Sequence, residues 1–222
     1  TQDLLMFGSP VFFIKNNRDY KAVLDFVNHG FWKALKTAAS HPSSFGPLIK
    51  GFSRLGKEQR KILKFKNPAN IPYFSATAYR LGRKEDPNKT AIKFGVNRIK
   101  CGQESFAHLS IDIKDENEPN YLRKSLAHTL NQQPVCFQYW VQPIDKKHAK
   151  KELLTEDPTI DWISKKINVA VVKVDPQDFD TPKMNEYCEH LSFTPWHSLP
   201  EHRPLGRTNR AVSYTHLTLP TT

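Results

Sequence analysis

Residues 135–142 alternate between two sets of side chains, and most members of both sets are large. An extended chain sends successive side chains to opposite faces of a sheet. The two faces would carry Val135, Phe137, Tyr139 and Val141 on one side and Cys136, Gln138, Trp140 and Gln142 on the other. Because both faces are substantial, we predict that this strand lies in the centre of a sheet.

The hydrophobic pattern changes its period from 3.6 to 2 residues at the proline-rich break 68–72. Before the break, apolar residues indicate short strands at 4–7 and 11–14, followed by helices at 20–35 and roughly 45–62. After the break come strands at 73–81, 92–96, 109–113 and 167–174, besides 135–142. Two shorter helices are predicted at 119–130 and 182–190. This order predicts an α+β fold, built on an antiparallel β-barrel with flanking helices.

The composition allows a real hydrophobic core. The chain has 222 residues, of which 38% are hydrophobic and 14 are phenylalanine. This length suits one large domain or two small ones. No run of about eighteen apolar residues occurs, so we expect no membrane-spanning helix.

The net charge of +11 would suit a nucleic acid or another anionic surface as a partner. The lysines and arginines are nevertheless scattered, and the densest stretch, 57–66, alternates charged and apolar residues as a solvated helix face does. No nucleic-acid-binding module is recognisable. A nucleic-acid binder is therefore the weaker interpretation, and a basic surface would equally attract carboxylates.

Three cysteines, Cys101, Cys136 and Cys188, are odd in number and widely spaced, and no two form a CxxC pair. This pattern predicts buried free thiols in a reducing compartment, not disulfides or a zinc site. On this basis we expect a cytoplasmic protein.

The segment 191–206, LSFTPWHSLPEHRPLG, carries three prolines, a tryptophan and two histidines in sixteen positions. Proline fixes φ and removes a backbone donor, so the segment is predicted to be a rigid loop of the kind that often carries function. Its histidines, His197 and His202, and the preceding His190 lack the spacing of helical metal ligands. We predict that they form hydrogen bonds and do not bind a metal.

Other patterns narrow the chemistry. A G-x-S-x-G elbow, a cysteine in a catalytic context and a glycine-rich phosphate loop are all missing, which disfavours a hydrolase or a kinase. Carboxylates beside Trp162, at Glu156, Asp157 and Asp161, are interpreted as a solvated turn before a strand. The aromatic stretch 9–20, SPVFFIKNNRDY, leaves open core packing or a wall for a flat apolar ligand such as a porphyrin.

Several stretches resemble the catalase superfamily, and in particular its small branch of catalase-related peroxidases. Residues 9–16, SPVFFIKN, are similar to the TPIFFIRD stretch of haem catalases. The loop 191–206 is close to a signature of the small branch. Further similar stretches are Ala78–Gly82, Pro134–Phe137, Glu156–Thr159 and Asp161–Trp162.

This resemblance implies a haem-binding antiparallel β-barrel and an oxidoreductase that acts on hydrogen peroxide or organic hydroperoxides. Haem b would be the cofactor, with a tyrosinate ligand to the iron and a distal histidine as the general acid–base group. An arginine in an R-x-x-x-Y motif would lower the pKa of that tyrosine. The matching positions for haem binding are Phe12, Phe13, Tyr20, Arg210 and Tyr214, with Tyr214 as the iron ligand.

The resemblance also gives the loop 191–206 a role. It would lead from the barrel into the helix that carries the axial ligand. Its histidines would brace the structure or meet haem propionates, as Arg203 and Arg207 would.

Two departures from the family's pattern matter. The family's distal histidine lies upstream of Thr1, and Phe7-Gly8 stand where catalases have two asparagines, so we expect an inactive fragment without its catalytic histidine. Residues 212–222 do not resemble the family, so we predict a partial haem domain over 1–211 followed by a non-native tail. The R-x-x-x-Y pattern that reaches into this tail is either the family motif or a coincidence.

Alternatives stay open from the sequence. The intact parent would degrade peroxide or rearrange a hydroperoxide without a second substrate, and the chain as given would alternatively be a non-catalytic barrel that binds haem or another apolar ligand. We expect a peroxide substrate, no nucleic-acid partner and no membrane span, and a homo-oligomer is one option.

Overall fold

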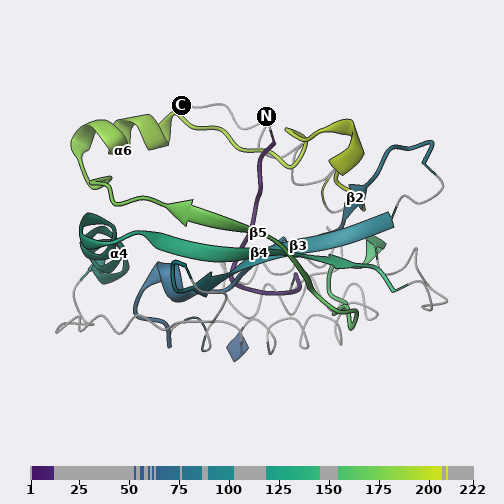
Figure 1. Ribbon diagram of the computed structural model, residues 1–222, viewed down its shortest axis with the longest axis horizontal. Helices are drawn as coiled ribbons and strands as arrows, with labels where there is room; N and C mark the ends of the chain where they lie inside the picture. The colour runs from purple at the N-terminus through teal and green to yellow at the C-terminus, as the bar shows by residue number, and fades with distance from the viewer. Residues whose placement is uncertain are drawn as a thin grey trace, which may run out of the picture.

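An antiparallel sheet forms the centre of the molecule, and helix α4 lies at one end of it (Figure 1). The computed structural model describes residues 2–12, 53, 56, 57, 60, 62, 64–75, 77–86, 90–102, 119–145, 155–206 and 209. Its elements are η1 (Pro68–Asn70), β1 (Tyr73–Phe74), β2 (Tyr79–Leu81), β3 (Thr90–Ile99), α4 (Tyr121–Gln132), β4 (Val135–Pro143), β5 (Ile167–Val174), α6 (Pro182–Glu189) and η2 (Pro200–His202). Helices combined with an antiparallel sheet confirm the α+β class.

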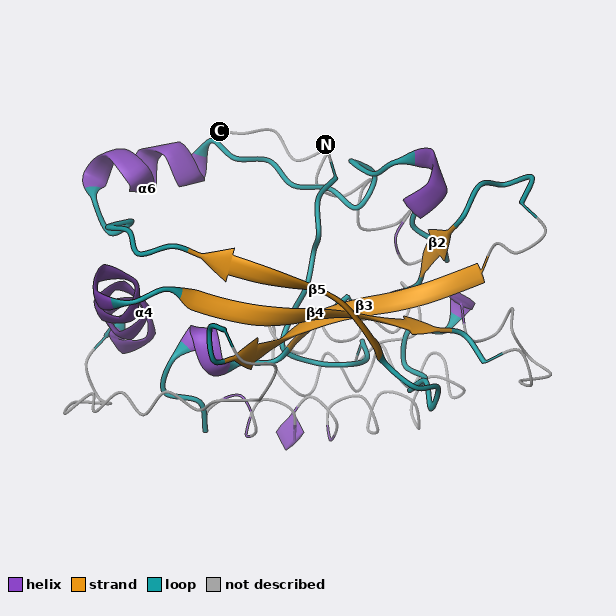
Figure 2. Ribbon diagram, viewed as in Figure 1, coloured by secondary structure: helices purple, strands orange, loops and turns teal. Residues whose placement is uncertain are grey.

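The strands pair antiparallel in the order β1-β3-β4-β5, and β2 also pairs with β3 (Figure 2). β4 lies between β3 and β5, which confirms the central position predicted for 135–142. Within the described residues the sheet is open, because β5 pairs there only with β4. The antiparallel sheet is therefore confirmed, whereas its closure into a barrel stays a prediction. The predicted strand 109–113 lies outside the described residues.

Large aromatic side chains cover one face of the β3–β4 pair. The Phe94 ring centroid lies 4.9 Å from that of Tyr79 and 5.9 Å from that of Tyr139. Both Phe94 and Tyr79 are buried, as is Ile92 in the same cluster. The alternation of 92–96 thus places its apolar residues in a core, as the period of 2 predicted.

On the opposite face, Gly95 makes room for Trp140. The two residues are partners across β3 and β4. A β-carbon on Gly95 would stand 2.4 Å from Cζ2 of Trp140 and 2.3 Å from the carbonyl oxygen of Tyr73. Glycine at this position therefore lets the indole ring pack flat on the sheet.

The predicted strand 73–81 forms two short strands, because the strand ends before Ser75 and resumes at Tyr79. The Ser75 hydroxyl donates to the carbonyl oxygen of Thr77 at 2.9 Å and accepts from the backbone N–H of Phe94 at 3.1 Å. A side chain here replaces a bond of the backbone ladder. The predicted strand 4–7 is also shorter than expected, since Phe7 forms an isolated bridge with Phe74 and its neighbours lie outside any strand.

Helix α4 packs its predicted apolar side at the end of the sheet, where Leu130 is buried and Leu126 is partly buried. Asn67 ties the preceding turn to this helix. Its Nδ2 donates to the Ser125 carbonyl oxygen at 3.1 Å and to Thr129 Oγ1 at 2.9 Å. A buried amide with these partners fixes where the helix sits on the sheet.

The remaining helix predictions have mixed outcomes. The helix predicted over 182–190 is confirmed as α6, and its N-cap Thr181 accepts from the backbone N–H of Met184 at 3.3 Å. Within 45–62, the described residues 53, 56, 57, 60 and 62 are helical. The helix predicted over 20–35 lies outside the described residues.

Strand β5 is exposed on both faces at the edge of the sheet. Ile167, Val169, Val171 and Val172 keep 42–54% of their surface accessible. An apolar edge of this kind can accept another strand.

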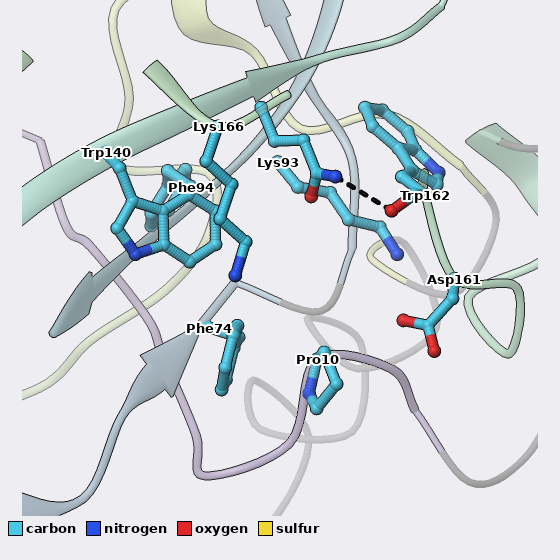
Figure 3. Close-up of a pocket in the computed structure, with 9 residues that line it drawn as sticks. Pro10, Phe74, Lys93, Phe94, Trp140, Asp161, Trp162 and Lys166 are labelled. Carbon is cyan, nitrogen blue, oxygen red and sulfur yellow. Dashed lines mark hydrogen bonds between the residues drawn. The ribbon is translucent and has the colours of Figure 1, made fainter. Parts of the chain in front are cut away.

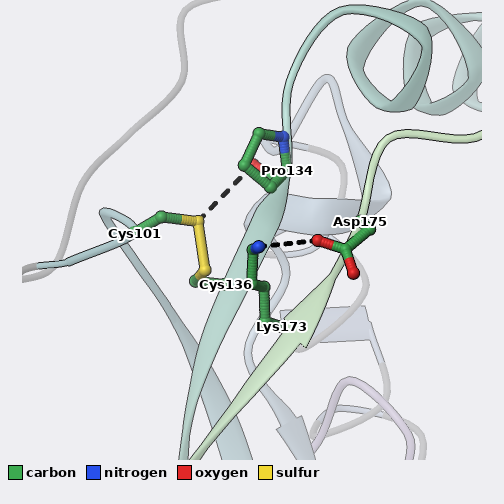
Figure 4. The surroundings of a disulfide bond; sticks show 5 residues. All are labelled: Cys101, Pro134, Cys136, Lys173 and Asp175. Carbon is green, nitrogen blue, oxygen red and sulfur yellow. Dashed lines mark hydrogen bonds and ion pairs between the residues drawn. A yellow bond between two sulfur atoms is a disulfide. The ribbon is translucent and has the colours of Figure 1, made fainter.

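Cys101 and Cys136 form a disulfide, with their Cα atoms 5.2 Å apart, so the prediction of three buried free thiols is wrong (Figure 4). The pairing of Ile99 with Cys136 brings the turn that follows β3 next to the start of β4. That register, which juxtaposes residues 35 positions apart, is not visible in the cysteine spacing. Cys188 is free and exposed.

Two predictions concern the chain as a whole. No helix in the described part of the chain is long and apolar enough to cross a membrane. The predicted boundary between 1–211 and the tail 212–222 lies outside the described residues.

Candidate functional site

The loop 191–206 lies beside the first residues of the chain. His197 Nδ1 is 3.0 Å from Asp3 Oδ2, and His202 Nδ1 is 2.8 Å from Gln2 Oε1. The backbone N–H of Thr194 and the His197 ring lower the pKa of the Asp3 carboxyl. The prediction that the loop histidines form hydrogen bonds is confirmed, and the described residues contain no group of His, Cys, Asp and Glu side chains that could hold a metal ion.

The same loop is fastened to the sheet. The Arg203 carbonyl oxygen accepts from the N–H of Arg80 in β2 at 2.8 Å, and Leu205 N–H donates to the Ala78 carbonyl oxygen at 2.8 Å. Gly206 follows with a φ of +83°, and a β-carbon there would stand 2.6 Å from a backbone carbonyl oxygen. The proline-rich loop is therefore a fixed brace, as its composition predicted.

The N-terminal segment 2–12 runs from this loop across to the turn that precedes β5 (Figure 1). Phe7 pairs with Phe74 on the way. The Phe12 N–H then donates to the Pro158 carbonyl oxygen at 2.9 Å, and the Phe12 ring meets the Phe7 ring edge-on with centroids 5.9 Å apart. The segment is thus held at both ends.

A cavity of about 100 Å³ lies between Pro10 of this segment, the sheet and the turn 160–166 (Figure 3). Aromatic side chains and charged side chains share its lining. They are Phe74, Phe94, Trp140, Trp162, Lys93, Lys166 and Asp161. The combination of aromatic walls with more cations than anions is the most distinctive chemistry among the described residues.

Lys93 is the buried cation of this cavity, with 4% of its surface exposed. Its Nζ donates to the Ile160 carbonyl oxygen at 3.2 Å and lies 5.3 Å from the ring centroid of Trp162. Burial lowers the pKa of Lys93 to about 8, although the carboxylates of Asp161 and Asp157 oppose this shift. The amine therefore titrates near neutral pH.

Lys166 approaches the cavity from the start of β5. Its Nζ lies 4.2 Å from the ring centroid of Trp140 and 5.0 Å from that of Phe74. Partial burial lowers the pKa of Lys166, and the Asp161 carboxylate opposes the shift. Neither Lys166 nor Lys93 has a carboxylate of the described residues within ion-pair distance.

Gln142 holds the turn that carries Trp162 against β4. Its Nε2 donates to the carbonyl oxygen of Trp162 at 2.8 Å, the dashed line in Figure 3, and to that of Ser164 at 2.7 Å. Trp140 beside it is 2% exposed, and its indole N–H has no acceptor among the described residues. The aromatic walls are thus set by β4 and by a turn bonded to β4.

The predicted haem-binding residues are described only in part. Phe12 is partly buried at the end of the N-terminal segment. Phe13, Tyr20, Arg210 and Tyr214 lie outside the described residues. Their roles stay predictions.

The loop residues proposed to meet haem propionates are also only partly described. Arg203 lies over the ring of Trp196, with its guanidinium carbon 5.3 Å from the centroid. Arg207 lies outside the described residues. His190, at the end of α6, has its Nδ1 2.7 Å from the Glu186 carbonyl oxygen.

Sequence reasoning missed the two lysines. The carboxylates of the turn 156–162 were expected to be solvated, which holds for the exposed Glu156 and Asp161 and is wrong for Asp157, which is buried as Trp162 is. The alternation of 92–96 places Lys93 on the face opposite Ile92 and Phe94, where a lysine is ordinarily solvated, so no signal in the sequence indicated that this cation is buried. Lys166 follows a basic, polar turn and carries no such signal either.

The cavity does not fit a haem. Its volume of about 100 Å³ is well below the roughly 300–1,000 Å³ of cofactor pockets. No tyrosine, histidine or cysteine of the described part of the chain lines it, so it offers none of the usual protein ligands of haem iron. This cavity is therefore not the site of a haem iron.

The chain was compared with known proteins. No protein-family model matches it, and no curated protein matches it. Similar solved structures include a fungal catalase (TM-score 0.61, 13% identity, 98% of this chain and 43% of that chain), catalase A from Saccharomyces cerevisiae (0.62, 14%, 98% and 44%) and a bacterial catalase (0.56, 14%, 90% and 39%). The chain therefore has a catalase-like fold and spans less than half the length of the catalase chains it matches.

Proposed function

We propose that the chain is part of a haem-dependent, catalase-like oxidoreductase that acts on hydrogen peroxide or organic hydroperoxides. The observation that carries this proposal is the catalase-like fold, which extends over 98% of the chain. The sequence resemblance of 9–16 and 191–206 supports it independently. The contacts that join the loop 191–206 to the segment leading to Phe12 are consistent with both stretches belonging to one functional unit.

Haem b, when bound, would supply an iron that reacts with peroxide. Phe12, Phe13 and Tyr20 would lie against it, and Tyr214 would ligate the iron with Arg210 lowering the pKa of that phenol. Because the described cavity does not fit the group, we derive no reaction step through haem.

A haemin titration followed by absorption spectroscopy tests this proposal. We expect a saturable Soret band at one haem per chain. If Tyr214 is the ligand, Tyr214→Phe removes the tyrosinate charge-transfer band, and an unchanged band would assign the ligand to another residue. Absence of any specific Soret band would contradict the proposal.

Turnover of the haem-loaded protein distinguishes the reactions. Oxygen evolution from hydrogen peroxide reports catalase chemistry, dye oxidation reports peroxidase chemistry, and loss of a hydroperoxide without either reports rearrangement. Haem-loaded protein that is inactive in all three assays would remove the enzymatic proposal.

A second candidate function is non-catalytic binding of a ligand with an apolar part. The cavity favours it, because its described lining has aromatic walls and none of the usual haem ligands. For this function we expect saturable binding of a ligand with an apolar part and no Soret band in the haemin titration.

Three further expectations belong to the proposal. A cytoplasmic location was expected from three free thiols, and the Cys101–Cys136 disulfide removes that argument, because disulfides are typical of oxidising compartments. A homo-oligomer would be measured by light scattering, and the exposed edge of β5 is the surface to examine first. A nucleic-acid partner is not expected.

A further inference from the structure

We propose that the cavity binds a small organic carboxylate, with its acid group between Lys93 and Lys166 and its apolar part against the aromatic walls. The proposal requires neither haem nor peroxide chemistry.

The charges of the lining favour an anion. Lys93 and Lys166 face the cavity, and Asp161 is its one lining carboxylate among the described residues. A buried cation is costly unless it is paired or hydrogen-bonded. Lys93 is 4% exposed, yet its three ammonium donors have only the Ile160 carbonyl oxygen as an acceptor in the described part of the chain. A carboxylate would supply two further acceptors and a compensating charge.

The walls favour a carboxylate that carries an apolar group. The ammonium of Lys166 lies over Trp140 and Phe74, and that of Lys93 points toward Trp162 and Asp161 (Figure 3). The space between the two cations is therefore bounded by aromatic rings. Aromatic surface attracts hydrocarbon as well as cations. A bare inorganic anion would leave this surface unused.

The size of the cavity limits the ligand. About 100 Å³ accommodates a compact acid such as benzoate or butyrate, and it is small for a long fatty acid. Lys166 and Asp161 are both exposed at its rim, so a ligand can enter from solvent without opening the sheet. Benzoate is the natural probe, because benzamide has nearly the same shape and carries no charge.

Calorimetric titration of the protein with benzoate tests the proposal. We expect saturable binding of one benzoate, with benzamide and inorganic phosphate each at least tenfold weaker. Lys93→Met removes one cation at nearly constant volume and should weaken benzoate roughly tenfold to a hundredfold. Lys166→Met, at an exposed position, provides a second variant that is expected to fold and to weaken binding in the same direction. The control, Lys183→Met on the exposed side of α6, should leave the affinity unchanged.

Binding should also depend on pH. The carboxylates of Asp157 and Asp161 act on Lys93, and Lys166 lines the same cavity. Lys93 loses its charge as the pH rises through about 8. The affinity for benzoate should therefore fall above that pH in the wild type and be flatter in Lys93→Met.

Several outcomes would overturn the proposal. They are no saturable heat with benzoate, equal affinity for benzamide, and unchanged affinity in both lysine variants. If phosphate bound as tightly as benzoate, the claim that the aromatic walls contribute to binding would be wrong. Because the titration is run without haem, its failure is independent of the Soret measurement that tests the proposed function.

Discussion

Replacing Lys93 with methionine should stabilise the protein. The ammonium of Lys93 is 4% exposed and has one hydrogen bond, to the Ile160 carbonyl oxygen at 3.2 Å. Methionine has a similar length, no charge and a flexible thioether that suits an aromatic cavity. The variant therefore removes the cost of a buried charge and keeps most of the packing.

The magnitude follows from the titration of the amine. Burial lowers the pKa of Lys93 from 10.5 to about 8. At about 1.4 kcal/mol per unit, the charged form is disfavoured in the folded state by on the order of 3 kcal/mol at pH 7. Loss of the hydrogen bond to Ile160 offsets about 1 kcal/mol. The net gain in the free energy of unfolding is therefore about 2 kcal/mol.

The same titration predicts how stability changes with pH. Between about pH 8 and 10.5 the unfolded chain keeps the proton on Lys93 while the folded protein has lost it. Because the unfolded state then binds more protons, the free energy of unfolding rises with pH over this window. Lys93→Met should lack this rise, so its advantage over the wild type should shrink toward high pH.

Urea unfolding followed by tryptophan fluorescence at pH 7 and pH 9.5 measures both effects. Lys183→Met is the control, since that lysine is exposed on α6 and its loss should change stability by less than about 0.5 kcal/mol. The reasoning would be refuted if Lys93→Met were less stable than the wild type. It would also be refuted if the difference in the free energy of unfolding between the two proteins were the same at pH 7 and pH 9.5.

Three other features give predictions. Reduction of the Cys101–Cys136 disulfide, which spans 35 positions, should lower the free energy of unfolding by up to about 4 kcal/mol in urea titrations. Thiol labelling of the native protein should modify Cys188 alone. Labelling of two or three thiols would count against the disulfide. Gly95→Ala should cost about 1–3 kcal/mol by the same titration, because the new methyl group would collide with a tryptophan ring and a backbone carbonyl; a neutral effect would mean that the sheet adjusts freely. Burial raises the pKa of Tyr79 to about 12, so the free energy of unfolding should fall between pH 10 and 12, and a Tyr79→Phe protein with the same decline would exclude this cause.

The elements whose pattern follows one period were predictable from the sequence. Two substantial faces placed 135–142 in the centre of the sheet, and the face of Leu126 and Leu130 identified α4. In both cases a local repeat reports which sides of the element are buried. The rigid character of 191–206 was predictable for a similar reason, since proline restricts the backbone whatever surrounds it.

What the sequence could not provide depends on contacts between distant segments. The break between β1 and β2 involves the Ser75 hydroxyl bonded to Phe94, and the disulfide arises from the register of β3 on β4. The cavity requires β1, β3, β4, the segment with Pro10 and the turn 160–166 to meet, so its lysines had no common signal along the chain. Buried polar groups of this kind are decided by tertiary packing, which a periodicity cannot report.

Burial of the Lys93 ammonium among aromatic rings is the claim on which the carboxylate site and the stability prediction both depend. Heteronuclear NMR of lysine-labelled protein measures it directly, with Lys93→Met used to assign the signal. We predict a pKa near 8 for Lys93 that rises when benzoate is added. A pKa near the ordinary 10.5, unchanged by benzoate, would contradict the claim.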